Sequence, residues 1–228
     1  MQYELSASMM CANYANLQQE VQMLNEGGID SYHLDVMDGQ FVDNFGMGYQ
    51  DMEFIRRATS KKLEAHLMIN NPQRYFSILS KIGLDVAYIH PESTHVPEIA
   101  IEELRKLGII PGIAINPGTS IAAIEELLNI VDRVLVLCVV PGHAGREFAP
   151  YVSRKIDKLL SLKDKYQFDI YWDGACTREK VLEYSVKGVK GFILGTSLLF
   201  NRKETYTDIL KKLRGEISMR ISEGEVIC

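Results

Sequence analysis

Two histidines and two aspartates stand at or near the ends of short apolar segments that are far apart in the sequence. They are His33, Asp35, His66 and Asp173. Because the side chains of an extended strand alternate between its two faces, His33 and Asp35 are expected to point the same way. Two imidazoles and two carboxylates form a mixed nitrogen and oxygen ligand set that suits Zn²⁺, Fe²⁺, Mn²⁺ or Co²⁺. The four side chains therefore predict a divalent metal site, provided that the fold brings them together.

Each of these residues also has a simpler interpretation when it is taken alone. A single histidine at the end of a strand is commonly a hydrogen-bonded structural residue, and a single aspartate there commonly caps the next helix. Short patterns of this kind often match by chance. Four such residues at or near the ends of three predicted strands favour a shared site over four separate structural roles.

The chain alternates between strand-like and helix-like patterns from one end to the other. The predicted strands are Leu5–Ser8, Ser31–Asp35, Leu63–Met68, Val86–His90, Ile110–Ile115, Val134–Cys138, Asp169–Asp173 and Gly191–Leu194. The predicted helices are Ala15–Gly27, Gln50–Thr59, Pro72–Ile82, Val96–Leu107, Ile121–Asn129, Pro150–Tyr166, Thr177–Val186 and Tyr206–Glu223. Apolar residues in the helices recur at three- and four-residue spacing, which is typical of one buried face. Several helices end at a glycine, namely Gly27, Gly83, Gly108 and Gly188.

Eight strands that each precede a helix predict a parallel sheet with right-handed crossovers. For 228 residues, an α/β fold of the closed (β/α)8 type, the TIM barrel, is the natural arrangement, and an open doubly wound sheet is the alternative. The sequence shows no linker, low-complexity segment or change of composition, so residues 1–228 are predicted to form a single domain. A barrel places its active site at the C-terminal ends of the strands, where the four candidate ligands stand.

The formal net charge of −5 argues against some classes of partner. No cluster of lysine and arginine stands out, so neither nucleic acid nor an anionic membrane is expected to bind. A small molecule is the expected partner, and an anionic one would have to be held by local groups. No apolar run approaches the roughly 18 residues that span a bilayer.

The cysteines and the N-terminal residues indicate a cytoplasmic location. The four cysteines, Cys11, Cys138, Cys176 and Cys228, are widely spaced and form no CxxC pair. This spacing predicts reduced thiols rather than a disulfide framework or a structural zinc site. The first residues lack the basic and apolar regions of a signal peptide.

Loops that contain glycine follow the last three predicted strands. They are residues 140–145 (V-P-G-H-A-G), 173–175 (D-G-A) and 195–197 (G-T-S). Small residues allow backbone N–H groups to approach a ligand closely, and barrels often bind phosphate after strands seven and eight. Each loop alone could be only a tight turn, but their position favours a phosphate site.

The chain resembles the ribulose-phosphate 3-epimerase family along nearly its whole length. The most specific stretch is residues 33–44, H-L-D-V-M-D-G-Q-F-V-D-N, which is similar to the family signature H-x-D-V-M-D-G-x-F-V-P-N. Supporting matches are S-A-S at residues 6–8, H-L-M at 66–68, N-P-G-T at 116–119 and P-G-H-A-G at 141–145. Within the family, residues 10–11, 90–92, 174–176 and 195–201 are more similar to D-allulose-6-phosphate 3-epimerase.

The resemblance implies a role for each residue of the site. His33, Asp35, His66 and Asp173 would hold one divalent ion per subunit (Zn, Mn, Co, Fe or Mg), and Asp35 and Asp173 would also act as the acid/base pair. The residues that would bind the substrate are Ser8, Met37, His66, Met68, Gly142, Gly145, Gly174, Ala175, Gly195 and Thr196. Among them, the two methionines would cushion the reacting carbons, and the glycines, Ala175 and Thr196 would line the phosphate site. The family likeness also implies a homo-oligomer, either a dimer or a hexamer.

The implied reaction is the inversion of carbon 3 of a ketose phosphate through a metal-stabilised cis-enediolate. A divalent ion stabilises the charge on the two oxygens, and two carboxylates on opposite faces alternate as base and acid. The expected substrates are D-allulose 6-phosphate and D-fructose 6-phosphate, and the alternative pair is D-ribulose 5-phosphate and D-xylulose 5-phosphate. A catalytically silent barrel that binds a sugar phosphate is a further alternative. Barrel decarboxylases and lyases commonly use a catalytic lysine, and no lysine stands at a predicted strand end.

The sequence departs from the family pattern at several positions without losing an implied ligand or acid/base residue. The departures are Ala7, Asp43, Leu137, His143, Arg146 and Ala175. His143, Arg146 and Ala175 fall near the phosphate end of the substrate or on the covering loop, so they bear on the choice of substrate and not on the reaction.

Overall fold

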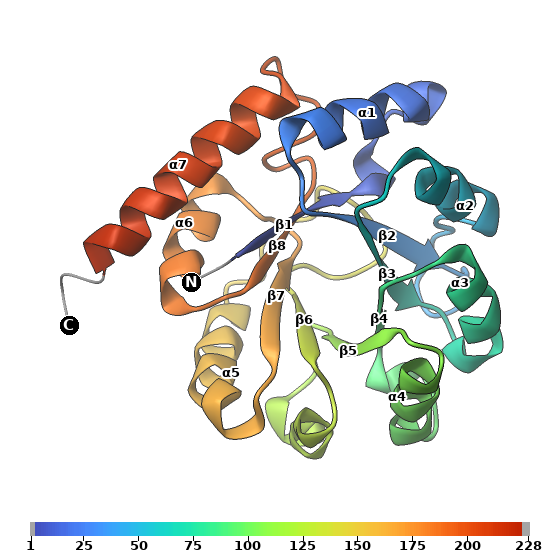
Figure 1. Cartoon of the computed structure of the whole chain (residues 1–228). Coiled ribbons are helices and arrows are strands. Elements are labelled where there is room, and N and C mark those ends of the chain that lie inside the picture. The colour runs from blue at the N-terminus through green and yellow to red at the C-terminus, as the bar shows by residue number, and fades with distance from the viewer. Residues whose placement is uncertain (1–2, 225–228) are drawn as a thin grey trace.

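The structure, a computed structural model, describes residues 3–224 and contains a closed barrel of eight parallel strands (Figure 1). The strands are β1 (Glu4–Ser8), β2 (Ser31–Met37), β3 (Lys62–Met68), β4 (Val86–Ile89), β5 (Ile110–Ile115), β6 (Arg133–Leu137), β7 (Asp169–Asp173) and β8 (Gly191–Leu194). They pair in chain order, and β8 pairs with β1 to close the ring. The predicted TIM barrel is therefore confirmed, and the open sheet is excluded.

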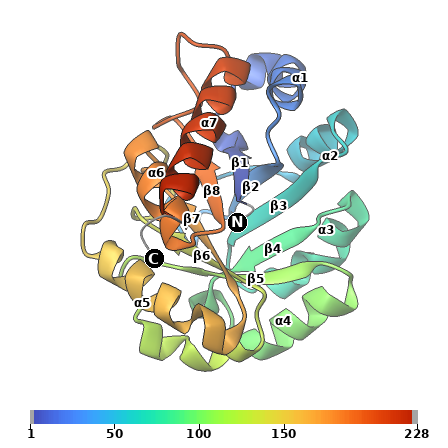
Figure 2. The ribbon, with the colours of Figure 1, turned by 60° about the vertical axis from the view of Figure 1, so that its left-hand side comes forward.

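Helices surround the barrel on its outer side (Figure 1). The α-helices are α1 (Leu17–Gly27), α2 (Tyr49–Ala58), α3 (Phe76–Ile82), α4 (Pro97–Lys106), α5 (Val152–Tyr166), α6 (Arg178–Lys187) and α7 (Tyr206–Gly224). The last helix packs against both α6 and α1, so it joins the end of the helical ring to its beginning (Figure 2). None of the helices in the described part of the chain is long and apolar enough to cross a membrane.

The predicted helix Ile121–Asn129 is wrong. Two short 3₁₀-helices, η5 (Ile121–Ala123) and η6 (Glu125–Asn129), take its place between β5 and β6. Backbone hydrogen bonds span three residues here, as from Ile124 N to Ile121 O and from Leu127 N to Ile124 O. A 3₁₀-helix has three residues per turn, so the apolar residues 121, 124, 127 and 130 align on one side and pack on the core. The predicted helices Ala15–Gly27 and Pro72–Ile82 both begin later than predicted, because 3₁₀-helices precede α1 and α3.

Two apolar regions stabilise the barrel. The larger one lies between the outer faces of the strands and the helices. The smaller one consists of Val86, Tyr88, Ala114, Leu135, Leu137, Tyr171 and Ile193, which come from five of the strands. The rings of Tyr88 and Tyr171 lie over Gly112 and Gly191 of the neighbouring strands, where a Cβ atom would collide with them. Glycine at these two positions therefore makes the room that the two aromatic rings occupy.

Candidate metal centre

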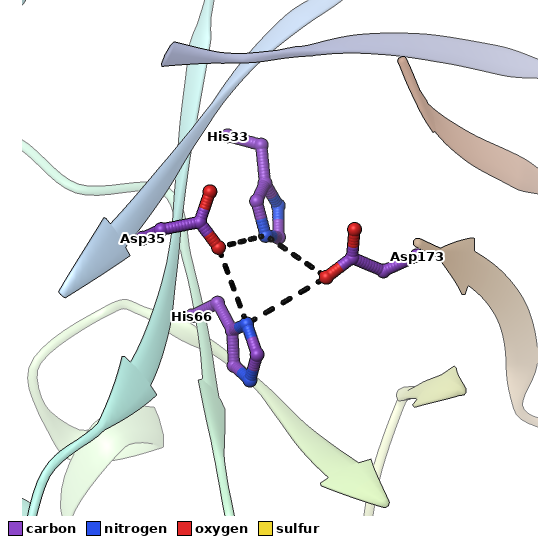
Figure 3. A group of neighbouring side chains, drawn as sticks. All are labelled: His33, Asp35, His66 and Asp173. Carbon is purple, nitrogen blue, oxygen red and sulfur yellow. Dashed lines mark ion pairs between the residues drawn. The ribbon is translucent and has the colours of Figure 1, made fainter. Parts of the chain in front are cut away.

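The four predicted ligands converge at the C-terminal ends of β2, β3 and β7 (Figure 3). Asp35 Oδ1 lies 3.5 Å from His33 Nε2 and 3.4 Å from His66 Nδ1. Asp173 Oδ2 lies 4.0 Å from His33 Nε2 and 3.7 Å from His66 Nδ1. Asp35 and His66 face each other in the β2–β3 register, which explains why they meet. The two carboxyl groups lie on either side of the pair of imidazoles.

The spacing of the four donor atoms fits a single divalent cation. Ligands at 2.0–2.2 Å from a tetrahedral ion are about 3.4 Å from one another. The four measured separations are 3.4–4.0 Å, and all four atoms lie within 4.8 Å of one another. His33 Nε2 and His66 Nδ1 are buried and have no hydrogen-bond partner in the described part of the chain. Buried nitrogens without a partner are costly, so a cation between these residues would satisfy them.

Burial and neighbouring side chains shift the pKa values of His33, Asp35 and Asp173. Burial lowers the pKa of His33, but the neighbouring Asp35 and Glu64 raise that pKa well above its usual value. Burial raises the pKa of Asp35, yet His33 and His66 outweigh it and hold the pKa of this carboxyl below its usual range. Burial, together with the charge of Asp35, raises the pKa of Asp173. The two carboxyl groups thus differ in proton affinity, as in an acid/base pair.

Other polar side chains contact residues of the cluster and orient them. Ser8 Oγ donates a hydrogen bond of 2.9 Å to Asp35 Oδ2. His66 Nε2 lies 2.8 Å from His90 Nε2, and His33 Nδ1 lies 3.6 Å from Glu64 Oε1. Support of this kind orients the ligand rings and sets which nitrogen carries the proton.

An open cavity lies above the cluster. All ten residues predicted to bind the substrate line it: Ser8, Met37, His66, Met68, Gly142, Gly145, Gly174, Ala175, Gly195 and Thr196. Asp35 and Asp173 also reach its wall, whereas His33 is fully buried beneath it. The glycine loops after β6, β7 and β8 therefore meet at one cavity, as the sequence predicts.

An apolar cluster forms part of the cavity wall. Met37 and Met68 are register partners on β2 and β3, and they pack with Val42. Met10 and Phe41 pack against this cluster. The methionines therefore lie where a soft, polarizable surface would face a ligand bound above the cluster.

The turn after β7 is sharp because two consecutive residues adopt left-handed backbone conformations. Gly174 has a φ of +85° and Ala175 a φ of +46°. A side chain at Gly174 would press into Val139, which also lines the cavity. An alanine with positive φ is strained, so Ala175 is a site where the chain maintains an unfavourable backbone geometry beside the cavity.

Sequence reasoning missed two charged residues beneath the cluster. Glu64 is 1% exposed and contacts His33, and Arg133 is 8% exposed and contacts Glu64. The signal was present for Glu64, which lies within the predicted strand Leu63–Met68 and shares a strand face with His66, whereas Arg133 stands one residue before the predicted strand Val134–Cys138. Both residues lie in the barrel interior, below the strand ends where the candidate ligands were sought.

Comparison with known proteins agrees with this geometry. The model of the ribulose-phosphate 3-epimerase family matches residues 4–199. A protein named ribulose-phosphate 3-epimerase from Methanocaldococcus jannaschii is 32% identical over 213 residues, 92% of this chain and 89% of that protein. One of the same name from Bacillus subtilis is 30% identical over 211 residues, 90% of this chain and 97% of that protein.

The barrel and its cluster thus define an isomerase of the epimerase class. The chain belongs to the ribulose-phosphate 3-epimerase family.

Solved structures with little sequence similarity share the fold. A tryptophan synthase structure from Mycobacterium tuberculosis has a TM-score of 0.64 at 13% identity and covers 96% of this chain and 93% of its own. A thiamine phosphate pyrophosphorylase from Pyrococcus furiosus has a TM-score of 0.64 at 13% identity and covers 96% of each chain. At this identity the likeness concerns the barrel alone.

Proposed function

We propose that this chain is a metal-dependent 3-epimerase that interconverts D-allulose 6-phosphate and D-fructose 6-phosphate. The observation that carries the proposal is the position of Asp35 and Asp173 on either side of two imidazoles, at the floor of a cavity lined by glycine loops. His33, Asp35, His66 and Asp173 would hold the divalent ion. That ion would stabilise negative charge on the substrate oxygens at carbons 2 and 3.

The two aspartates would move the proton. One carboxylate removes the proton from carbon 3, and the other carboxyl group returns a proton to the opposite face. Ser8 keeps one oxygen of Asp35 engaged, which leaves Oδ1 directed at the imidazoles. Met37 and Met68 would shield the planar carbon centre from water without competing for the ion.

The far end of the cavity would hold the phosphate. Gly174, Ala175, Gly195 and Thr196 offer backbone groups there, and Arg146 is the only lysine or arginine among the described residues that line the cavity. A guanidinium near the phosphate would offset the repulsion from the acidic cluster. His143 lies beside Arg146, with 3.4 Å between His143 Nδ1 and the guanidinium, and the two could contact the outer hydroxyls of a longer sugar.

The second candidate substrate pair is D-ribulose 5-phosphate and D-xylulose 5-phosphate. The names of the relatives support this pair, because the proteins from Methanocaldococcus jannaschii and Bacillus subtilis are both named ribulose-phosphate 3-epimerase. Residues that resemble the allulose-phosphate enzymes support the six-carbon pair, and Cys11 and Cys176 among them line the cavity. The reaction and the proposed residue roles are the same for both pairs.

A side-by-side assay decides between the two pairs. The purified chain is supplied with a divalent metal and given D-allulose 6-phosphate and D-ribulose 5-phosphate in separate reactions. We expect a higher kcat/KM for the six-carbon substrate, and a higher value for ribulose 5-phosphate would assign the second pair. Exchange of the carbon 3 hydrogen with deuterated solvent reports the proton transfer directly. A chain that binds both sugars but exchanges no hydrogen would be a silent binding barrel.

A further inference from the structure

A chain of charged and polar side chains runs through the barrel interior beneath the proposed metal centre, buried from His33 to Arg133 and partly exposed beyond. It starts at His33 on β2 and continues through Glu64 on β3, Arg133 on β6 and Glu4 on β1. Lys62 at the start of β3 completes it at the far end of the barrel, 3.2 Å from Glu4 Oε1. Buried charges are costly unless they are paired, so a network of this length needs a reason.

Glu64 is the member that contacts the cluster. Its Oε1 lies 3.6 Å from His33 Nδ1 and 3.3 Å from the hydroxyl of Ser31. Its Oε2 accepts a hydrogen bond of 3.1 Å from the hydroxyl of Tyr88 and lies 3.7 Å from Arg133 Nη1. One oxygen therefore faces the imidazole while partners hold the other.

The ring nitrogen of His33 that faces away from the cluster, Nδ1, needs a hydrogen-bond acceptor. In the part of the chain that the structure describes, His33 Nδ1 is buried and has no hydrogen-bond partner. A small rotation of either side chain would close the 3.6 Å gap to Glu64 into a hydrogen bond. The proton would then reside on Nδ1, and the lone pair of Nε2 would point at the two aspartates.

Arg133 holds the carboxylate in place from below. Its guanidinium lies between Glu64 and Glu4, 3.7 Å from Glu64 Oε2 and 3.4 Å from Glu4 Oε2. It also lies 4.6 Å from the ring centre of Tyr171, whose hydroxyl donates a 2.9 Å hydrogen bond to Glu4. Two carboxylates and two cationic side chains balance the charge of the network, so loss of Arg133 would leave Glu64 with no lysine or arginine beside it among the described residues.

We propose that Glu64 is a positioning residue for His33 and that Arg133 holds Glu64 in place, so that this network sets the affinity and geometry of the metal centre. The inference rests on the metal site of the proposed function. It goes beyond that function, because neither Glu64 nor Arg133 lines the substrate cavity. The network acts on the ion through the orientation of His33 alone.

The test measures metal binding rather than turnover. The full chain is stripped with a chelator and titrated with Zn²⁺ and with Co²⁺, and the Kd and the visible absorption of the cobalt form are recorded. We expect Glu64→Gln and Arg133→Met to raise the Kd by about 10- to 100-fold and to shift the cobalt bands. Arg133→Lys, which keeps the charge, should recover most of the affinity. Arg105→Met is the matched control, because Arg105 pairs with Asp132 on the surface.

Folded Glu64→Gln protein with wild-type Kd and wild-type cobalt spectrum would overturn the proposal. If that variant does not fold, Tyr88→Phe decides in the same way, because it removes only the hydroxyl that holds Glu64 Oε2. A purely structural network would lower the melting temperature without moving the cobalt bands. Failure of the wild-type chain to bind either ion would instead refute the metal centre itself, so the two failures are distinct.

Discussion

The Nε2 atoms of His66 and His90 lie 2.8 Å apart beneath the floor of the cavity. With His66 Nδ1 as a ligand of the proposed ion, Nε2 would carry the ring proton and donate a hydrogen bond to His90 Nε2. Burial lowers the pKa of His90 well below its usual value. His90 therefore stays neutral, and its Nε2 can accept this hydrogen bond.

Replacement of His90 should loosen the metal centre. His90→Phe keeps an aromatic ring but leaves the buried N–H of His66 without an acceptor, at a cost of about 1–3 kcal/mol in unfolding free energy. We expect weaker metal binding and a lower denaturation midpoint, both measurable on the purified variant. The control is His95→Phe, since His95 is exposed. Unchanged metal affinity in His90→Phe would show that the contact does not orient His66.

Either aspartate should be indispensable for turnover. Asp35→Asn or Asp173→Asn removes both an acid/base group and a metal ligand, so kcat should fall by at least 10²–10⁴-fold while circular dichroism shows an intact fold. Asp169→Asn is the matched control, because Asp169 begins the strand that Asp173 ends and pairs with Lys163 on the surface. Substantial activity in either active-site variant would exclude the two-carboxylate mechanism.

Removal of the divalent ion should abolish activity and lower stability. A chelator-treated sample is expected to lose epimerase activity and to regain it when Zn²⁺, Mn²⁺, Co²⁺, Fe²⁺ or Mg²⁺ is added. The melting temperature should rise with ion concentration, because a ligand that binds only the folded state stabilises it. Full activity after verified removal of metal would contradict the proposed centre.

Arg146 should contribute to binding of the phosphorylated substrate. Arg146→Gln is expected to raise KM by about tenfold, since a charge-assisted contact contributes roughly 1.5–3 kcal/mol when buried and less when exposed. The effect on kcat should be small, because the contact is made equally in ground and transition states. Arg154→Gln, on the exposed side of α5, serves as the control. A loss of kcat at constant KM would place Arg146 in the chemistry instead.

Local sequence patterns were enough to predict the barrel and the four-residue cluster, but not the ionic network in the barrel interior. The two-residue spacing of His33 and Asp35 is itself a strand property, so it placed both side chains correctly. The carboxylate of Asp38, within the same signature, fixes its loop by accepting the backbone N–H groups of Gln40, Phe41 and Asn70. The ion pair between Glu64 on β3 and Arg133 on β6 forms across the interior of the closed barrel. A local sequence pattern does not show which side chains meet there.

The replacement of a helix by η5 and η6 has a different cause. Ile121, Ile124 and Leu127 are three residues apart, a spacing that fits an α-helix and a 3₁₀-helix alike. The preference between them depends on how the short β5–β6 connection packs on the core, which is tertiary information.

The ionic network has a consequence for how the ion would come and go. Glu64, Tyr88, Arg133 and Tyr171 fill the barrel below His33, so the cluster faces solvent through the cavity above it. A sugar phosphate seated in that cavity would lie across the exit route. Ion residence time should therefore lengthen as the cavity fills, and exchange of one metal for another would proceed fastest between turnovers.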